Sequence, residues 1–254
     1  MDATEQAMPI EEYLAQGGVL TSPDNVPGRY RGELLRLMAS FVDSEMAGSA
    51  GFAGTINAAP GLKSRIAAAR ITLEKTDHAE RVLKVMAEFG VDMARYAVHQ
   101  PWDARIGRDA DLGQVRHGGD MRLSVFHYPL QGWVDAVVMN VLQGLATVVT
   151  LRELVHVSYA PLASAFQEIA PREAHHVELG FEGLDRIVAD EDGLREARAS
   201  VEYWHPRVTA SFGPARSGRF ETLKKFGLRH RPNETLMADW KAETERRLAP
   251  LGLS

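Results

Sequence analysis

Apolar residues recur at intervals of three and four along most of the chain, the spacing that places side chains on one face of an α-helix. No strand-like alternation extends over a useful length. The sequence therefore predicts an all-α protein. Four long helices are expected at about 30–47, 60–89, 131–157 and 162–188. Shorter helices are expected at about 9–16, 91–98, 192–204 and 233–248.

The stretch 133–151 is apolar nearly all round, the pattern of a helix in the middle of a bundle. Asp135, Asn140 and Gln143 interrupt it, so it falls short of a membrane span and is predicted to be a buried core helix. In the fourth helix, Pro171 is expected to bend or unwind the turn before Glu173.

Glycine and proline divide the rest of the chain. Residues 1–29 are predicted to form an arm, of the kind that often lies across a neighbouring subunit, and 30–254 a single helical domain. The glycines at 48–54 are expected to end the first long helix. The segment 99–122 is long for a structureless connection and is typical of a lid or a disordered loop.

The composition narrows the class of function. The 254 residues are 45% hydrophobic and 25% charged, with a net charge of −5, which gives no electrostatic reason to expect nucleic acid. No cysteine is present, which excludes disulfides, iron–sulfur clusters and thiol nucleophiles. The chain does not open with a basic segment followed by an apolar one, so no membrane association and a cytoplasmic location are expected.

Carboxylates and imidazoles fall on the inner faces of three predicted helices. Glu45 lies within the apolar stripe of the first helix, where an unpaired acid is costly. His78 lies on the second helix, and Glu173 and His176 form an E-x-x-H motif on the fourth. Bundles that hold two metal ions use a glutamate from the first helix, an E-x-x-H motif from the second, a carboxylate from the third and another E-x-x-H motif from the fourth. These four side chains are therefore the predicted metal ligands.

Lys75 is the anomaly, because it stands three residues before His78, where an E-x-x-H motif has its glutamate. Glu74 shares the same helical face, so both residues are candidates for catalytic roles. A further E-x-x-H pair, Glu153 and His156, lies beyond the most apolar part of the third helix and is only a spare candidate.

The chain resembles the phenylacetic-acid catabolic family of ferritin-like proteins, and within it the catalytic subunits of ring-1,2-phenylacetyl-CoA epoxidases. The resemblance runs from about residue 30 to the C-terminus. It rests on Ser44-Glu45 with Gly48, Pro60, the helix through His78, Phe126-His-Tyr-Pro129 with Trp133 and Asp135, Ser158-Tyr-Ala-Pro161, Glu173-x-x-His176 with Gly180, Trp204-His-Pro206, and Phe212-Gly-Pro214.

The resemblance implies a ferritin-like four-helix bundle with additional C-terminal helices. It makes Glu45, His78, Glu173 and His176 family metal ligands for one or two iron ions, with manganese as an alternative. The implied reaction is O2-dependent oxidation of an aromatic acyl-CoA or a related small molecule. A reductase and a homologous ferritin-like subunit, or a second copy of the chain, are the implied partners.

Two positions depart from the family pattern. Lys75 stands in place of the glutamate of the second helix, and Gly144, beside Gln143, in place of a carboxylate of the third. Three arrangements remain open: a metal-free ion cluster around Lys75, a single metal ion held by the four ligands, or two ions with Glu74 or a carbamylated Lys75 as the replacement ligand. The first would suit a non-catalytic structural subunit that scaffolds a catalytic homologue.

Basic residues outside this site are candidates for contacts with the phosphates of an acyl-CoA. They are Arg105 and Arg108 in the long loop, and Lys224, Lys225 and Arg229 near the C-terminus.

Overall fold

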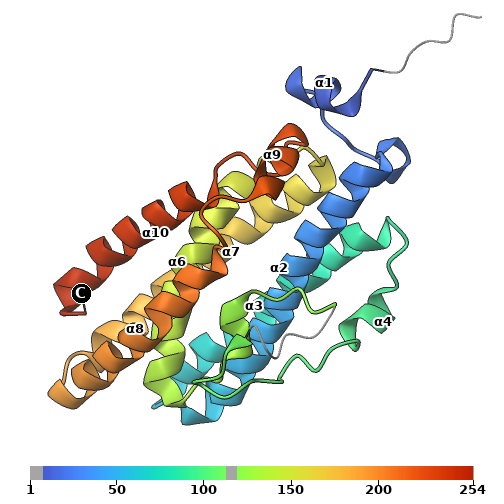
Figure 1. Ribbon diagram of the computed structural model, residues 1–254. Helices are drawn as coiled ribbons and strands as arrows, with labels where there is room; N and C mark the ends of the chain where they lie inside the picture. Colours follow the sequence, from blue (N-terminus) through green and yellow to red (C-terminus); the bar gives the residue numbers. More distant parts are fainter. Residues whose placement is uncertain (1–7, 113–118, 254) are drawn as a thin grey trace, which may run out of the picture.

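Four long helices form the core of the computed structural model, which describes residues 8–112 and 119–253 (Figure 1). They are α2 (Gly28–Thr55), α3 (Leu62–Ala87), α6 (Gly132–Leu154) and α7 (Ala160–Ile187). Helices α8 (Glu191–Ser211) and α10 (Asn233–Leu248) pack against α6. The described ranges contain no strand, and the predicted all-α, ferritin-like bundle with additional C-terminal helices is confirmed.

Helix α2 is longer than its sequence suggested. The glycines at 48–54 were expected to end it, and that expectation was wrong, because the helix runs on to Thr55. The reason lies in close packing at Gly48. A Cβ atom there would lie 3.2 Å from the ring of Phe126 and 3.3 Å from Cδ of Lys75. Gly48 therefore makes room for neighbouring side chains inside the helix instead of terminating it.

Helix α6 is the centre of the bundle. By length and composition it could cross a membrane, with a mean hydropathy of 1.7 over its most apolar window, so the expectation that it is too short was wrong. However, 78% of that window is buried against the rest of the chain, as predicted for a core helix. Its carboxylate at Asp135 accepts hydrogen bonds from Trp204 and Ser200 of α8, both at 2.8 Å, which satisfies the buried charge.

Two further helices depart from the sequence prediction. Helix α8 passes Pro206 and continues to Ser211, and α9 (Gly218–Lys225) was not foreseen. The unwinding expected at Pro171 was wrong, because α7 continues through this residue as a single helix.

The described part of the N-terminal arm binds the chain's own bundle. It contains α1 (Ile10–Ala15) and the 3₁₀ turn η1 (Pro23–Asn25). The backbone of Leu20 donates to Ser158 and accepts from Ala160, both at 2.8 Å. Leu20 is buried in the same apolar cluster as α2 and α7, so the arm closes one end of the bundle.

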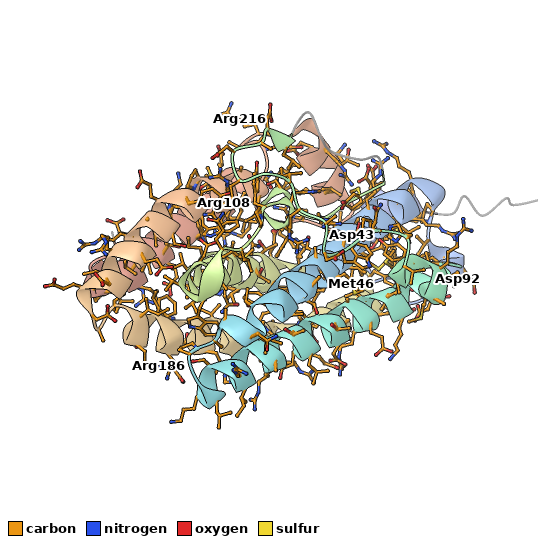
Figure 2. All side chains as sticks on the ribbon, turned by 90° about the horizontal axis from the view of Figure 1, so that it is seen from below. Asp43, Met46, Asp92, Arg108, Arg186 and Arg216 are labelled. Atoms are coloured by element: carbon orange, nitrogen blue, oxygen red, sulfur yellow. The ribbon has the colours of Figure 1, made fainter. Side chains whose placement is uncertain are left out.

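The long segment between α3 and α6 is tied to α2 at both ends. Figure 2 labels Asp43, the α2 residue that makes two of these contacts. It contains α4 (Met93–Ala97) and η3 (Ser124–His127), and residues 113–118 of the predicted 99–122 loop lie outside the described ranges. Asp43 accepts from the hydroxyl of Tyr96 at 2.7 Å and from the backbone N–H of Met121 at 2.8 Å. The N–H of Leu123 donates to Ser44 Oγ at 3.0 Å. These bonds fix the segment beside Glu45.

Candidate functional site

The predicted site residues come together at the centre of the bundle. Glu45 is supplied by α2, Lys75 by α3 and Glu173 by α7. Nζ of Lys75 lies 3.1 Å from Oε1 of Glu45 and 3.0 and 3.2 Å from the two carboxylate oxygens of Glu173. All three side chains are buried: the exposed fraction is 5% for Lys75, 3% for Glu45 and 1% for Glu173. The lysine ammonium therefore joins two acids that water does not reach.

His78 completes the cluster from α3, one turn beyond Lys75. Its Nδ1 lies 3.2 Å from Oε2 of Glu45 and 3.0 Å from Oε1 of Glu173, so it acts as a donor to both carboxylates. Its other nitrogen, Nε2, is buried without a hydrogen-bond partner among the described atoms. The ring of His78 stacks on that of His176, with centroids 5.7 Å apart.

His176 connects the cluster to its outer edge. Nε2 of His176 lies 2.7 Å from Oε2 of Glu74, and Nδ1 lies 3.4 Å from Oε1 of Glu173. The side chain of Glu74 is 24% exposed, whereas that of His176 is buried. Of the two residues proposed for catalysis from the sequence, Lys75 thus lies inside the cluster and Glu74 at its solvent side.

Charge is balanced within the cluster. Burial lowers the pKa of Lys75, but Glu173 and Glu45 outweigh it and hold that pKa above its usual value. Burial raises the pKa of Glu173, yet Lys75 and the hydrogen bonds of His176 and His78 hold it well below its usual range. Burial also lowers the pKa of His78, and its bonds to Glu173 and Glu45 reverse the shift. The charged forms of Lys75, Glu173 and His78 are therefore each favoured by their neighbours in the cluster.

Small and polar residues that sequence reasoning missed hold these groups in place. The glycine at 48 accommodates the stem of Lys75. Asn140 of α6 donates from Nδ2 to the backbone carbonyl of His176 at 3.0 Å and so fixes the last ligand-type residue of α7. In the sequence, Asn140 is only a polar break in an apolar helix. A polar side chain on the inner side of an apolar helix was the one sequence feature that could have indicated this contact with α7.

The residues do not fit a pair of metal ions. One ligand atom each from Glu45, His78 and Glu173 lies within 4.8 Å of the others, which is compatible with a single ion. However, the Lys75 ammonium stands between the two carboxylates. At Gly144, where the resemblance implies a carboxylate, even a Cβ atom would lie 2.8 Å from the side chain of Val177. The space expected for a second set of ligands is filled.

The spare metal motif belongs to a different network. The carboxylate of Glu153 is buried and bonded to the Arg229 guanidinium. It also accepts from the backbone N–H groups of His230 at 3.1 Å and Arg231 at 2.8 Å. Glu153 therefore anchors the segment before α10, and the structure does not bring it or His156 to the site.

Three of the five basic residues considered for phosphate contacts are bonded within the protein. Arg105 donates to the carbonyl of Ala47 at 2.7 Å, and burial lowers its pKa to about 10. Arg108 binds Asp135 at 2.8 Å. Arg229 binds Glu153. Lys224 and Lys225 are exposed in the last turn of α9.

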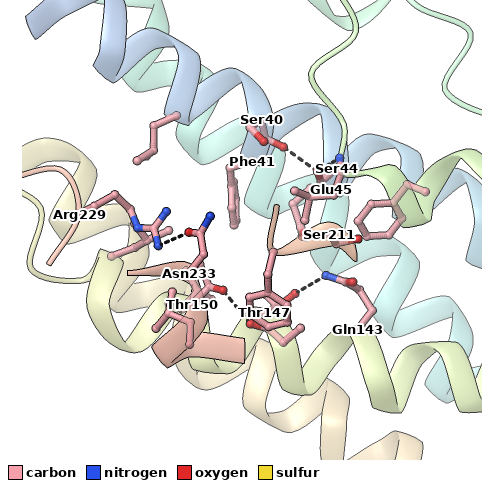
Figure 3. Close-up of a pocket in the computed structure, with 18 residues that line it drawn as sticks. Ser40, Phe41, Ser44, Glu45, Gln143, Thr147, Thr150, Ser211, Arg229 and Asn233 are labelled. Carbon is pink, nitrogen blue, oxygen red and sulfur yellow. Dashed lines mark hydrogen bonds between the residues drawn. The ribbon is translucent and has the colours of Figure 1, made fainter. Parts of the chain in front are cut away.

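A cavity of about 270 Å³ adjoins the cluster (Figure 3). Its lining includes Glu45, so it reaches the ion cluster from the side of α2 and α6. Most of its other walls are apolar or carry hydroxyl and amide groups. Sequence reasoning did not find this cavity, because its lining comes from segments far apart in the chain.

The chain matches known proteins over most of its length. The family model described as phenylacetic acid catabolic protein matches residues 8–254. The chain is also similar to one of the subunits of 1,2-phenylacetyl-CoA epoxidase from Escherichia coli (strain K12), with 26% identity over 208 residues. That match covers 81% of this chain and 62% of the relative, so the chain spans less than two thirds of the relative's length.

The first prediction concerns the ammonium group. We expect Lys75→Met to lower the free energy of unfolding by roughly 3–5 kcal/mol, because it leaves two buried carboxylates without their cation. Urea denaturation measures this loss. Lys84→Met is the matched control, since Lys84 is a largely exposed lysine on the same helix, paired with Glu80. Adding Glu173→Gln to Lys75→Met should recover part of the loss, and an additive further loss would contradict the charge balance.

The second prediction concerns pH. The pKa of Glu173 is lowered from 4.5, so its contribution to stability is complete above that value and is lost as pH falls through the folded-state pKa. The pKa of His78 is raised from 6.5, so its contribution is complete below that value and is lost as pH rises through the folded-state pKa. We therefore expect stability to be greatest between these two ordinary values.

The measurement is urea denaturation of wild type and His78→Gln over a series of pH values. The stability difference between them should shrink as the pH rises above 6.5. His175→Gln, at an exposed neighbouring position, should show no such change. A difference that stays constant across the series would contradict the assignment of His78 as a charged member of the cluster.

Proposed function

The chain belongs to the phenylacetic acid catabolic protein family, and from this premise we propose that it is a subunit of an oxygenase-type assembly whose own centre is an ion cluster instead of a metal site. The membership and the similarity to an epoxidase subunit support an oxygenase-type function at the level of the family. The companion role, in which a homologous chain supplies the oxygen chemistry, is our proposal for this protein.

The observation that carries the proposal is the position of the Lys75 ammonium, within 3.0–3.2 Å of oxygens of both Glu45 and Glu173. A metal ion would need those oxygens as ligands. The lysine already neutralises them and satisfies their hydrogen bonds, so a divalent ion gains little by entering. Both carboxylates are buried, which makes removal of the ammonium costly unless another cation replaces it.

The role that follows is structural. A bundle with a permanent ammonium in place of an exchangeable ion keeps α2, α3 and α7 together without depending on metal supply. Oxidation of the aromatic acyl-CoA or related small molecule would take place on a homologous ferritin-like subunit, which would also receive electrons from a reductase. The present chain would scaffold that subunit.

One alternative function has a specific observation in its favour. The ligand-type atoms of Glu45, His78 and Glu173 lie close enough together to hold one iron or manganese ion, as in a mononuclear oxygenase. This alternative requires the Lys75 ammonium to leave the cluster. Carbamylation of Lys75 is disfavoured, because that reaction consumes the neutral amine and the two acids keep the amine protonated.

Metal analysis separates these functions. We expect protein expressed with added iron and manganese to contain only trace amounts of either metal, and Lys75→Glu to raise the metal content because it replaces the displacing cation with a ligand. Lys84→Glu, at an exposed position of the same helix, should not raise it. A stoichiometric metal in the wild type that disappears in Glu173→Ala would support the mononuclear oxygenase instead.

The scaffold role predicts a complex of fixed composition. We expect co-expression with a family member from the same genome that carries glutamate at the position of Lys75 to give a heteromeric assembly, resolved by size-exclusion chromatography with light scattering. A family-unrelated helical bundle serves as the control partner. Substrate oxidation should require the glutamate-bearing partner, and turnover by the present chain alone would refute the non-catalytic role.

A further inference from the structure

The first half of α3 presents a row of apolar side chains to solvent. The exposed fraction is 79% for Leu62, 59% for Ile66 and 70% for Leu73. Ala69, which is also exposed, lies between the last two. Spacings of three and four residues place all four on one face of the helix. Single apolar residues are common on protein surfaces, but a continuous row is typical of a contact with another protein. We call these four residues the α3 stripe.

Positive charge surrounds the α3 stripe. The exposed side chains of Lys63, Arg65 and Arg70 flank it, and no acidic residue occurs at positions 61–73. Among the described residues, every ion pair of α3 involves Glu74 or a later position, so these three cations are unpaired. A surface that covers the stripe therefore needs apolar side chains together with negative charge.

The α3 stripe does not suit packing against the same stripe of a second copy. In an antiparallel pair with Ile66 opposite Ala69, Arg65 of each copy would lie opposite Arg70 of the other. In a parallel pair each cation would lie opposite its own counterpart. Like charges that face each other across a contact are unfavourable. The surface that covers the stripe is therefore a different one.

The N-terminal arm has the complementary character. Met8, Tyr13 and Val19 are exposed apolar side chains of the arm. The hydroxyl of Tyr13 donates to the carbonyl of Val19 at 3.1 Å, so these two residues lie side by side. Glu11 and Glu12 are exposed on α1, and positions 8–20 contain no lysine or arginine. The outer surface of the arm thus combines apolar side chains with negative charge.

The arm lies too far from the stripe of its own chain to cover it. Ile10 and Leu14 pack against the chain's own apolar core, and Leu20 is bonded to the start of α7. These contacts hold α1 near the start of α2, whereas α3 begins only after α2 has ended (Figure 1). Helix α2 has 28 residues, which separates the two surfaces by about 40 Å along the bundle.

We propose that two copies of this chain pack side by side and antiparallel, with the outer surface of each N-terminal arm on the α3 stripe of the other copy. A two-fold axis across the middle of the bundle brings the arm of each copy to the stripe of the other. Each of the two contacts joins apolar surface and opposite charges. This dimer goes beyond the scaffold role, because it joins identical chains and uses no residue of the ion cluster.

Engineered cysteines test the contact directly, since the chain has none of its own. We expect a chain that carries both Ala15→Cys and Ala69→Cys to give a covalent dimer with a cysteine-specific cross-linker that has a six-carbon spacer. Both positions are exposed and small, so the apolar and charged contact residues remain. Ala238→Cys with Ala69→Cys is the matched control, because Ala238 is exposed on α10, and it should stay monomeric on a denaturing gel.

An exchange of charges tests the recognition. Sedimentation velocity of the purified chain should show a dimer. We expect Glu11→Arg with Glu12→Arg to weaken the dimer by about tenfold or more, and Arg65→Glu with Arg70→Glu to do the same, because each pair of changes places like charges across the contact. A chain with all four changes restores opposite charges in reversed order, so it should recover most of the lost affinity.

Glu202→Arg with Glu245→Arg is the control for net charge, since both residues are exposed on the C-terminal helices, and it should leave the dimer unchanged. A chain that sediments as a monomer up to roughly 100 µM would overturn the proposal. So would a dimer that either pair of charge changes leaves intact, a four-residue exchange without recovery, or equal cross-linking of the control cysteines.

All of the changed residues are exposed, and an unchanged helical circular dichroism spectrum verifies that each variant is folded. The sedimentation of the wild type needs no variant. These measurements use one purified chain, so they do not depend on metal content or on a homologous partner, which test the proposed function separately.

Discussion

The lysine ammonium buried between two glutamates is the interaction on which the centre of this protein depends. Three helices meet there, and each contributes a charged group that would be strongly unfavourable alone in a dry interior. Together Lys75 and Nδ1 of His78 provide hydrogen-bond partners for both carboxylates, Glu45 and Glu173. The cluster therefore fixes which faces of α2, α3 and α7 turn inward, and it does so without an exchangeable ion.

The packing around the cluster follows from the size of its cation. The aliphatic side chain of Lys75 needs room to reach the two carboxylates. Gly48 of α2, which has no side chain, provides this room. Helix α6 carries Gly144, where a Cβ atom would lie 2.8 Å from the side chain of Val177. Asn140 holds the backbone of α7 at His176. The missing ligand and the added lysine are thus accommodated by neighbouring residues, which is why the bundle remains closely packed despite its departures from the family pattern.

Because the cluster neutralises its own charges, the adjoining cavity is an apolar space with hydrogen-bonding groups and no free ion among the residues that line it. Glu45 is part of the cluster and also lines the cavity. Its ion pair with Lys75 neutralises the charge that it would otherwise present to the cavity. Among the residues that the structure describes, Oε1 of Gln143 is a buried atom of the cavity lining without a hydrogen-bond partner. The same lysine thus bears on both the metal-binding capacity of the centre and the charge of the cavity wall.

The sequence by itself determined the helical class, the four long helices and which side chains share a helical face, such as Lys75 with His78 and Glu173 with His176, because helical periodicity fixes these relations. It could not determine whether Lys75 enters the site or bends away, since that depends on space left by Gly48, more than twenty residues away in the chain. The sequence also could not predict the end of α2. Its glycines have the pattern of a helix terminus, but Gly48 lies within the helix and allows close packing with Phe126 and Lys75. Only the tertiary structure brought α2, α6 and the start of α10 together around one cavity, because packing between distant segments leaves no local periodicity to detect.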